Sequence, residues 1–297
     1  MPSAPVLMII PHCSGYVPHD IMADMLGEDV YDVSQCQARL EYLFNEGDPY
    51  TDSLFYMPGA SHVSGLVSRF VVDLNRKRDE GGMNGVIKLT DFSGAHLYPL
   101  DFQFSETGVA ERLERYYDPF HSALDRNLAR DDILFFIDGH SMTPLGPMIG
   151  PDRGEPRPAF CLITGGDPEG HPLTPGDSVS IPAGLAQEVV RLLKKHFDDI
   201  VKATPGVPDA YWINDPFSKG GTNDRLSNPV NPNAKPGFAL EFNRALYLQE
   251  GNRDLNEELD APIPGRIKEL NKRFQAFVND LIPLFEALRV GETGAIS

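Results

Sequence analysis

The chain has 297 residues, and its 43 Asp and Glu against 26 Lys and Arg give a formal net charge of −17 at pH 7. This charge opposes binding to nucleic acid backbones and to anionic membranes, so we expect neither as a partner. The three cysteines do not form a disulfide framework, and neither a signal sequence nor a membrane-length apolar run is recognisable. We therefore expect a cytoplasmic protein.

Strand-like and helix-like segments alternate along the chain, which is typical of an α/β fold. Apolar, β-rich runs predict strands at residues 6–10, 66–74, 133–141, 160–164, 211–217 and 238–248. Helical spacing predicts helices at residues 20–27, 34–44, 109–128, 182–201 and 267–288, the third interrupted by Pro119. Residues 144–182 are rich in Pro and Gly and predict a long loop that could form one wall of a pocket.

Two of the predicted strands lead into histidines. The run 6–10 is followed by His12 and Cys13, and the run that begins at residue 133 ends in Asp138, Gly139 and His140. Ligands of an open α/β sheet bind beyond the carboxyl ends of its strands, so both imidazoles are expected where chemistry is possible. A lone histidine is more often a hydrogen-bonded core or loop residue, but two in matched settings indicate a metal pair. Cys13 is a weaker candidate, as a nucleophile.

Polar side chains also accompany two other apolar runs. Arg69 lies within the run 66–74, and Asn75 and Arg76 follow it, although solvated charges at a strand end explain these three equally well. Glu241 stands in the middle of the run 238–248, where a carboxylate is costly unless it has a partner. Two histidines, a carboxylate, a buried glutamate and arginines are together the parts of a zinc amide hydrolase, with Glu241 as the natural base.

These residues lie in a series of motifs that resembles the N-formylglutamate amidohydrolase family from about Leu7 to about Leu288. The motifs are Pro11-His12-Cys13-Ser14-Gly15, Tyr50-Thr51-Asp52, the run from Ser68 to Arg76, Tyr117-Asp118-Pro119-Phe120-His121, Asp138-Gly139-His140-Ser141, Lys219-Gly220-Gly221 and Leu240-Glu241-Phe242. The segment Asp73-Leu74-Asn75-Arg76 is also similar to aspartoacylases and zinc carboxypeptidases. The resemblance implies a three-layer α/β sandwich with a mixed, mainly parallel sheet. We expect one domain over residues 1–297, with a loose tail from about residue 290.

The resemblance implies one zinc ion, held by His12, a carboxylate and His140. In the aspartoacylases and carboxypeptidases the carboxylate follows the first histidine by three residues, where this chain has Gly15. The metal-binding acid must therefore come from elsewhere, and Asp52 in the Thr-Asp motif fits best. Weaker candidates for this ligand are Asp20, Asp24 and Asp138.

The resemblance also implies roles for the remaining polar residues. Glu241 acts as general base or acid, Arg69 polarises the scissile carbonyl, and Asn75 and Arg76 hold the substrate carboxylate. Two further substrate-binding positions are expected at Ser14 and Gly221. The resemblance thus implies a zinc-dependent deformylase, an enzyme that hydrolyses N-formylglutamate in the degradation of histidine. Two alternatives stay open, a hydrolase of another N-acyl amino acid or small peptide and a non-catalytic ligand-binding relative.

Overall fold

The computed structural model describes residues 4–150, 152–219, 221–249 and 261–291. Its centre is a six-stranded sheet in the order β2-β1-β3-β6-β4-β5, in which every neighbouring pair is parallel except β4 and β6. The strands are β1 (Val6–Ile10), β2 (Ser61–Ser64), β3 (Phe135–Met142), β4 (Phe160–Ile163), β5 (Tyr211–Ile213) and β6 (Gly237–Asn243). The mixed, mainly parallel sheet confirms the predicted fold class. A separate ribbon pairs β7 (Leu248–Gln249) with β8 (Ala261–Pro262).

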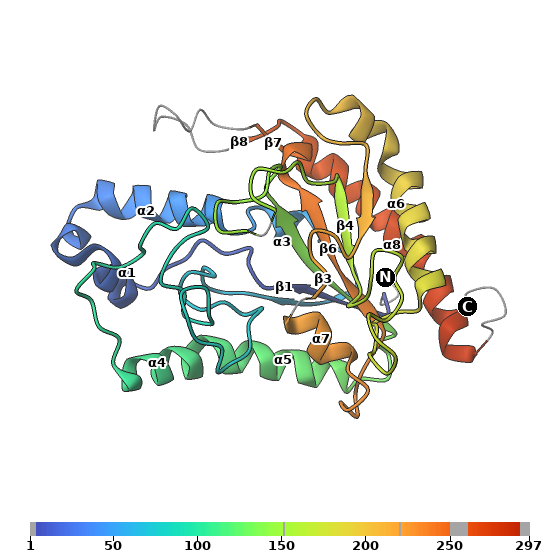
Figure 1. The fold of residues 1–297 in the computed structure, drawn as a ribbon, viewed down its shortest axis with the longest axis horizontal. Coiled ribbons are helices and arrows are strands. Elements are labelled where there is room, and N and C mark those ends of the chain that lie inside the picture. The colour runs from blue at the N-terminus through green and yellow to red at the C-terminus, as the bar shows by residue number, and fades with distance from the viewer. Residues whose placement is uncertain (1–3, 151, 220, 250–260, 292–297) are drawn as a thin grey trace.

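Helices cover both faces of the sheet and give three layers (Figure 1). One face packs against α3 (Thr51–Leu54), α6 (Ala183–Ala203) and α8 (Arg266–Val290). The other face packs against α1 (His19–Leu26), α2 (Val33–Glu46), α4 (Glu106–Arg112), the π-helix η2 (Leu113–Tyr117), α5 (Asp118–Leu128) and α7 (Gly221–Ser227). Two 3₁₀ turns, η1 (Gly27–Tyr31) and η3 (Arg244–Leu246), complete the helical elements of the described residues.

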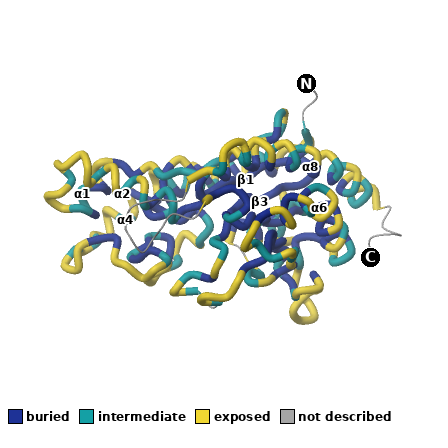
Figure 2. Tube along the Cα trace, turned by 90° about the horizontal axis from the view of Figure 1, so that it is seen from above, coloured by how far each residue is buried: buried dark blue, intermediate teal, exposed yellow. Residues whose placement is uncertain are grey.

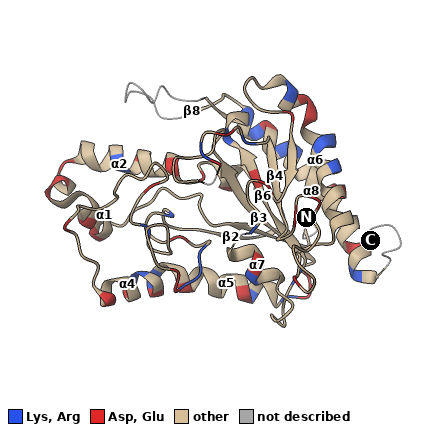
Figure 3. Ribbon diagram, viewed as in Figure 1, with Lys and Arg blue, Asp and Glu red and all other residues tan. Residues whose placement is uncertain are grey.

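The strands lie at the centre because their side chains are apolar on both faces. In β1, Met8 faces the core under α6 and α8, whereas Leu7 and Ile9 face the core under α5. Figure 2 shows the buried strands between more exposed helices. Figure 3 shows charged residues on the outer helices, among them α4, α5, α6 and α8. Such a sheet, covered on both faces, has its open crevices beyond the strand ends.

The prediction of a strand at residues 66–74 is wrong. The segment forms turns, and the neighbouring strand β2 is shorter and earlier in the chain. Val71 donates a backbone hydrogen bond to the Ser68 carbonyl at 2.9 Å, which replaces a sheet ladder by a local turn. Phe70, Val71 and Val72 are nevertheless fully buried, so the apolar run indicated burial rather than strand.

The predicted break at Pro119 is also absent. The chain stays helical from α4 to the end of α5, and the π-helix η2 ends two residues before Pro119. Proline has no N–H to donate to the preceding turn, and here it follows the π-helix, where the hydrogen-bond register of the helix changes. None of the described helices is long and apolar enough to cross a membrane. The loose tail expected from about residue 290 lies almost wholly outside the described residues.

Candidate active site

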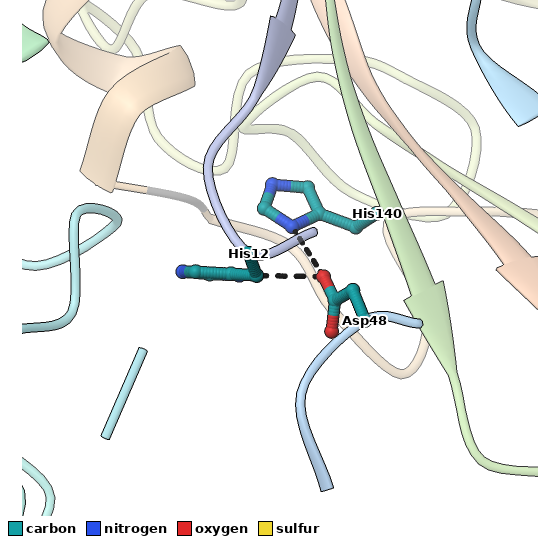
Figure 4. Close-up of side chains that lie close together, drawn as sticks. All are labelled: His12, Asp48 and His140. Carbon is teal, nitrogen blue, oxygen red and sulfur yellow. Dashed lines mark hydrogen bonds and ion pairs between the residues drawn. The ribbon is translucent and has the colours of Figure 1, made fainter. Parts of the chain in front are cut away.

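Two imidazoles face one carboxylate near the carboxyl ends of two central strands (Figure 4). His12 lies two residues beyond β1, and His140 lies in the neighbouring strand β3. Their Nδ1 atoms are 3.3 and 3.0 Å from the same Oδ2 atom of Asp48. All three side chains are buried, and their ligand-type atoms lie within 4.8 Å of one another. The structure thus brings together the two histidines that the sequence analysis singled out.

The carboxylate of this group is Asp48 and not the expected Asp52. Asp52 lies on α3, is exposed and does not belong to the buried group. The weaker candidates Asp20 and Asp24 lie on α1, where they pair with arginines of η2 and α4. Asp138 is buried beside His140 but on the far side of the ring from Asp48. The sequence analysis gave Asp48 no role.

The turn that carries Asp48 is held from both ends of the chain. The Asp48 backbone N–H donates to the His12 carbonyl at 3.2 Å. Arg244, directly after β6, donates to the carbonyls of Asn45 and Gly47, and the Tyr247 hydroxyl donates to the Pro49 carbonyl at 3.1 Å. These contacts position the carboxylate between the two rings.

Each imidazole meets a second carboxylate through its other nitrogen. His12 Nε2 is 2.8 Å from Asp73 Oδ1, and His140 Nε2 is 3.1 Å from Asp138 Oδ1. A carboxylate at one ring nitrogen fixes the ring orientation and tautomer and leaves the other nitrogen to face a metal. Asp73 belongs to the quoted Asp-Leu-Asn-Arg segment, but the sequence analysis gave it no role.

The charge of Asp73 is stabilised by two buried cations. Arg69 Nη2 and Lys88 Nζ each lie 3.0 Å from Asp73 Oδ2, and the Lys88 side chain is fully buried. Burial favours a raised pKa at Asp73, but Arg69 and then Lys88 outweigh it and hold this pKa well below the ordinary range. Burial in turn lowers the pKa of Lys88 to about 8. Asp73 is therefore a carboxylate when it meets His12.

Burial and hydrogen bonding act against each other within the His-Asp-His group. Burial tends to raise the pKa of Asp48, but hydrogen bonds with His12 and His140 hold it well below the ordinary value. Burial tends to lower the pKa of His140, but Asp138 and then Asp48 hold it well above the ordinary value. The group is thus built around a charged carboxylate, which suits a cation placed among the three side chains.

Glu241 stands beside this group. It pairs in register with His140, so the two side chains share one face of the sheet. Burial raises the Glu241 pKa to about 7, although His140 opposes the shift. Its Oε2 atom has no hydrogen-bond partner among the residues that the structure describes. Glu241 can therefore accept or release a proton near neutral pH.

These side chains open into a cavity of about 700 Å³. The expected site residues in its lining are His12, Arg69, Asn75, Arg76, His140, Gly221 and Glu241, together with Asp48. Arg69 also reaches Asp48, with Nη1 3.4 Å from Oδ1. The predicted Ser14 is not in the lining, since its hydroxyl donates to the Leu66 carbonyl at 3.0 Å. Burial raises the Cys13 pKa to about 12, so its thiol is not activated as a nucleophile.

Asn75 is held by the segment that begins at Gly221. A Cβ atom at Gly221 would lie only 2.8 Å from the Asn75 carbonyl oxygen, so the glycine allows the two backbone segments to approach closely. Thr222 N–H donates to Asn75 Oδ1 at 2.8 Å. This bond orients the amide and leaves Nδ2, 3.5 Å from His140 Nε2, on the cavity side.

The mainly parallel sheet and the cavity are typical of a hydrolase, with a carboxylate of raised pKa, an arginine and a buried His-Asp-His group in one site. The model of the N-formylglutamate amidohydrolase family matches residues 4–248, and the chain belongs to this family. It is therefore an enzyme that hydrolyses amide bonds, and the resemblance drawn from the motifs is confirmed.

Two solved structures share the fold. A crystal structure of N-formylglutamate amidohydrolase from Ralstonia eutropha JMP134 aligns with a TM-score of 0.63 at 20% identity, over 98% of this chain and 96% of that one. A gene product from Agrobacterium tumefaciens aligns with a TM-score of 0.53 at 18% identity, over 97% and 92% of the two chains. No curated protein sequence matches the chain significantly.

Proposed function

We propose that this protein hydrolyses the amide bond of N-formyl amino acids such as N-formylglutamate, with one zinc ion as its cofactor. The products are formate and the free amino acid. The observation that carries the proposal is the placement of Glu241 in one cavity with the His-Asp-His group, with its pKa near 7 and its Oε2 atom without a hydrogen bond to any described residue. Family membership supports the N-formyl substrate.

The donor set fits zinc. Nδ1 of His12 and Nδ1 of His140 both face Asp48 Oδ2, and one ligand atom from each of the three residues lies within 4.8 Å of the others. Imidazole nitrogens and a carboxylate oxygen are the ligands that catalytic zinc sites use, and three protein ligands leave a position for water or substrate. Zinc bound there would supply a water of lowered pKa and a Lewis acid for the carbonyl oxygen. Asp73 and Asp138 would keep both rings oriented toward it.

Other side chains of the cavity transfer protons, stabilise the developing charge and bind the substrate. Glu241 accepts the proton that the attacking water loses and can return it to the departing amine nitrogen. Arg69, held by Asp48 and Asp73, presents its positive charge toward the cavity and stabilises the negative charge that develops on the carbonyl oxygen. Asn75 and Arg76 line the same cavity and bind the substrate carboxylate by charge-assisted hydrogen bonds.

The proposal is tested by measuring formate release from N-formylglutamate together with zinc content. The purified enzyme should release formate, lose activity on chelation and regain it with zinc. His12→Ala, Asp48→Ala and His140→Ala should abolish stoichiometric zinc binding. Asp52→Ala is the matched control, because Asp52 is exposed and outside the His-Asp-His group. Zinc retention in Asp48→Ala with loss in Asp52→Ala would return the third ligand to Asp52, and no formate release would refute the activity.

A further inference from the structure

The cavity is larger than a formyl group and a small amino acid require. Cavities of about 300 to 1,000 Å³ enclose drug-sized ligands, and this one measures about 700 Å³. Its polar groups gather around the His-Asp-His group, Glu241 and the Asn75-Arg76 pair. Much of the remaining lining consists of apolar side chains.

The sheet itself provides an apolar floor beside Glu241. Met142 follows His140 by two residues in β3, and Ala239 precedes Glu241 by two residues in β6, so both lie on the catalytic face. Ile163 of β4 pairs with Ala239 on the same face. With Cys161 these residues form a small apolar cluster, separate from the two main cores and packed against Phe217. Met142, Ile163, Ala239 and Phe217 all line the cavity.

The segment after β3 adds an apolar wall. Every residue from Met142 to Met148 lines the cavity, and Leu145 and Met148 are 52% and 53% exposed. The backbone is nevertheless ordered by hydrogen bonds with residues 154–157, including Gly146 N–H to the Glu155 carbonyl at 3.0 Å. Large apolar side chains that are held in place and left uncovered at a cavity indicate a ligand-binding surface.

The cations of the lining leave this wall without a strong site for a second carboxylate. Arg157 pairs with both carboxylate oxygens of Asp152, at 2.6 and 3.0 Å, and Arg244 donates to the carbonyls of the Asp48 turn. Arg69 and Arg76 serve the reacting carbonyl and the α-carboxylate in the proposed function. Among the described lining residues, the cation left over is Lys219, which is exposed.

We infer that Met142, Leu145, Met148 and Phe217 form a side-chain subsite, and that N-formyl amino acids with large apolar side chains, such as N-formylleucine, are preferred substrates. This inference rests on the proposed function. That function makes the acyl group a single formyl carbon, so the group that covers the apolar wall is the amino-acid side chain. The α-carboxylate stays with Asn75 and Arg76.

The test compares kcat/KM for N-formylleucine, N-formylalanine and N-formylglutamate on the zinc-loaded enzyme. One methylene in an apolar pocket changes specificity by roughly 10- to 200-fold, so N-formylleucine should exceed N-formylalanine by at least about tenfold. Leu145→Ser and Met148→Ser should each lower this leucine-to-alanine ratio. Leu173→Ser is the matched control, because Leu173 is 50% exposed but lies outside the cavity lining, and it should leave the ratio unchanged.

The outcomes separate this inference from the proposed function. Turnover of all three substrates without a leucine preference, or a preference for N-formylglutamate, overturns the apolar subsite and leaves the activity standing. If no N-formyl amino acid is cleaved, the activity fails, and calorimetric binding of N-formylleucine and N-formylalanine still decides the subsite. Tighter binding of N-formylleucine that is lost in Leu145→Ser supports it, and equal binding of the two ligands refutes it.

Discussion

Replacement of Glu241 by glutamine should make the stability of the zinc-free protein less dependent on pH, and it should remove the activity of the zinc-loaded enzyme. The folded-state pKa of about 7 lies above the value of 4.5 expected in the unfolded chain. Between these two values the folded state holds a proton that the unfolded state has released. The stabilisation from the protonated carboxyl is therefore complete below pH 4.5 and is lost as the pH rises through 7.

The difference between the two pKa values corresponds to about 3 kcal/mol. Glu241 keeps some contact with the cavity, so solvent reduces this figure, and we expect about 2 kcal/mol. Glutamine does not titrate, and any pH-independent cost of burying its amide cancels when two pH values are compared. The unfolding free energy of Glu241→Gln minus that of the parent should thus increase by about 2 kcal/mol between pH 5 and pH 8.5.

Urea unfolding of chelator-treated parent and variant at the two pH values measures this difference. Glu111→Gln, at an exposed position of α4, is the control and should show no such change. In the zinc-loaded enzyme, loss of the general base should lower kcat by about 100-fold or more. A pH-independent stability difference, or one of the opposite sign, would show that Glu241 is not held with a raised pKa.

Three further substitutions test the residues around the site. Arg76→Lys should lower kcat/KM for N-formylglutamate by roughly 1.5 to 3 kcal/mol, the range for charge-assisted hydrogen bonds, and an unchanged value would remove the carboxylate clamp. Tyr117 donates to the Arg76 carbonyl at 2.8 Å, so Tyr117→Phe should raise KM about 2- to 10-fold at constant kcat in steady-state kinetics. The neighbouring Tyr116→Phe should not, and equal effects of the two would point to general destabilisation. Asp73→Asn should weaken zinc binding by roughly 10- to 100-fold in chelator competition, whereas the exposed Asp79→Asn should bind like the parent.

The spacing of apolar residues predicted most of the strands and helices, because the burial of one or both faces of an element determines that spacing. The apolar run 6–10 matches β1 to the residue, and the helical spacing of 182–201 corresponds closely to α6. The run 66–74 failed for a physical reason. β-branched and apolar residues report a buried environment, and here a chain of turns occupies that environment beside the site.

The site was predictable where it depends on strand ends and less so where it depends on turns. His12 and His140 follow from the apolar runs that precede them, and Glu241 follows from its cost in an apolar strand. Asp48 contacts partners 36 and 92 residues away. Those contacts determine where the Asp48 side chain points, and the spacing of residues along the turn does not predict this direction. The motif containing Asp52 is local, whereas the carboxylate that lies between the two histidines is selected by the tertiary structure.

The hold of Arg244 and Tyr247 on the Asp48 turn has a consequence for the order of assembly. These contacts join residues 197 to 199 positions apart, so they form only after most of the chain has been synthesised. A nascent chain that ends before β6 carries His12, Asp48 and His140 but lacks the hydrogen bonds of Arg244 and Tyr247 that position the Asp48 carboxylate between the rings. Because domains generally fold as units, the arrangement of His12, Asp48 and His140 is completed late, after the residues that hold the Asp48 turn have been synthesised.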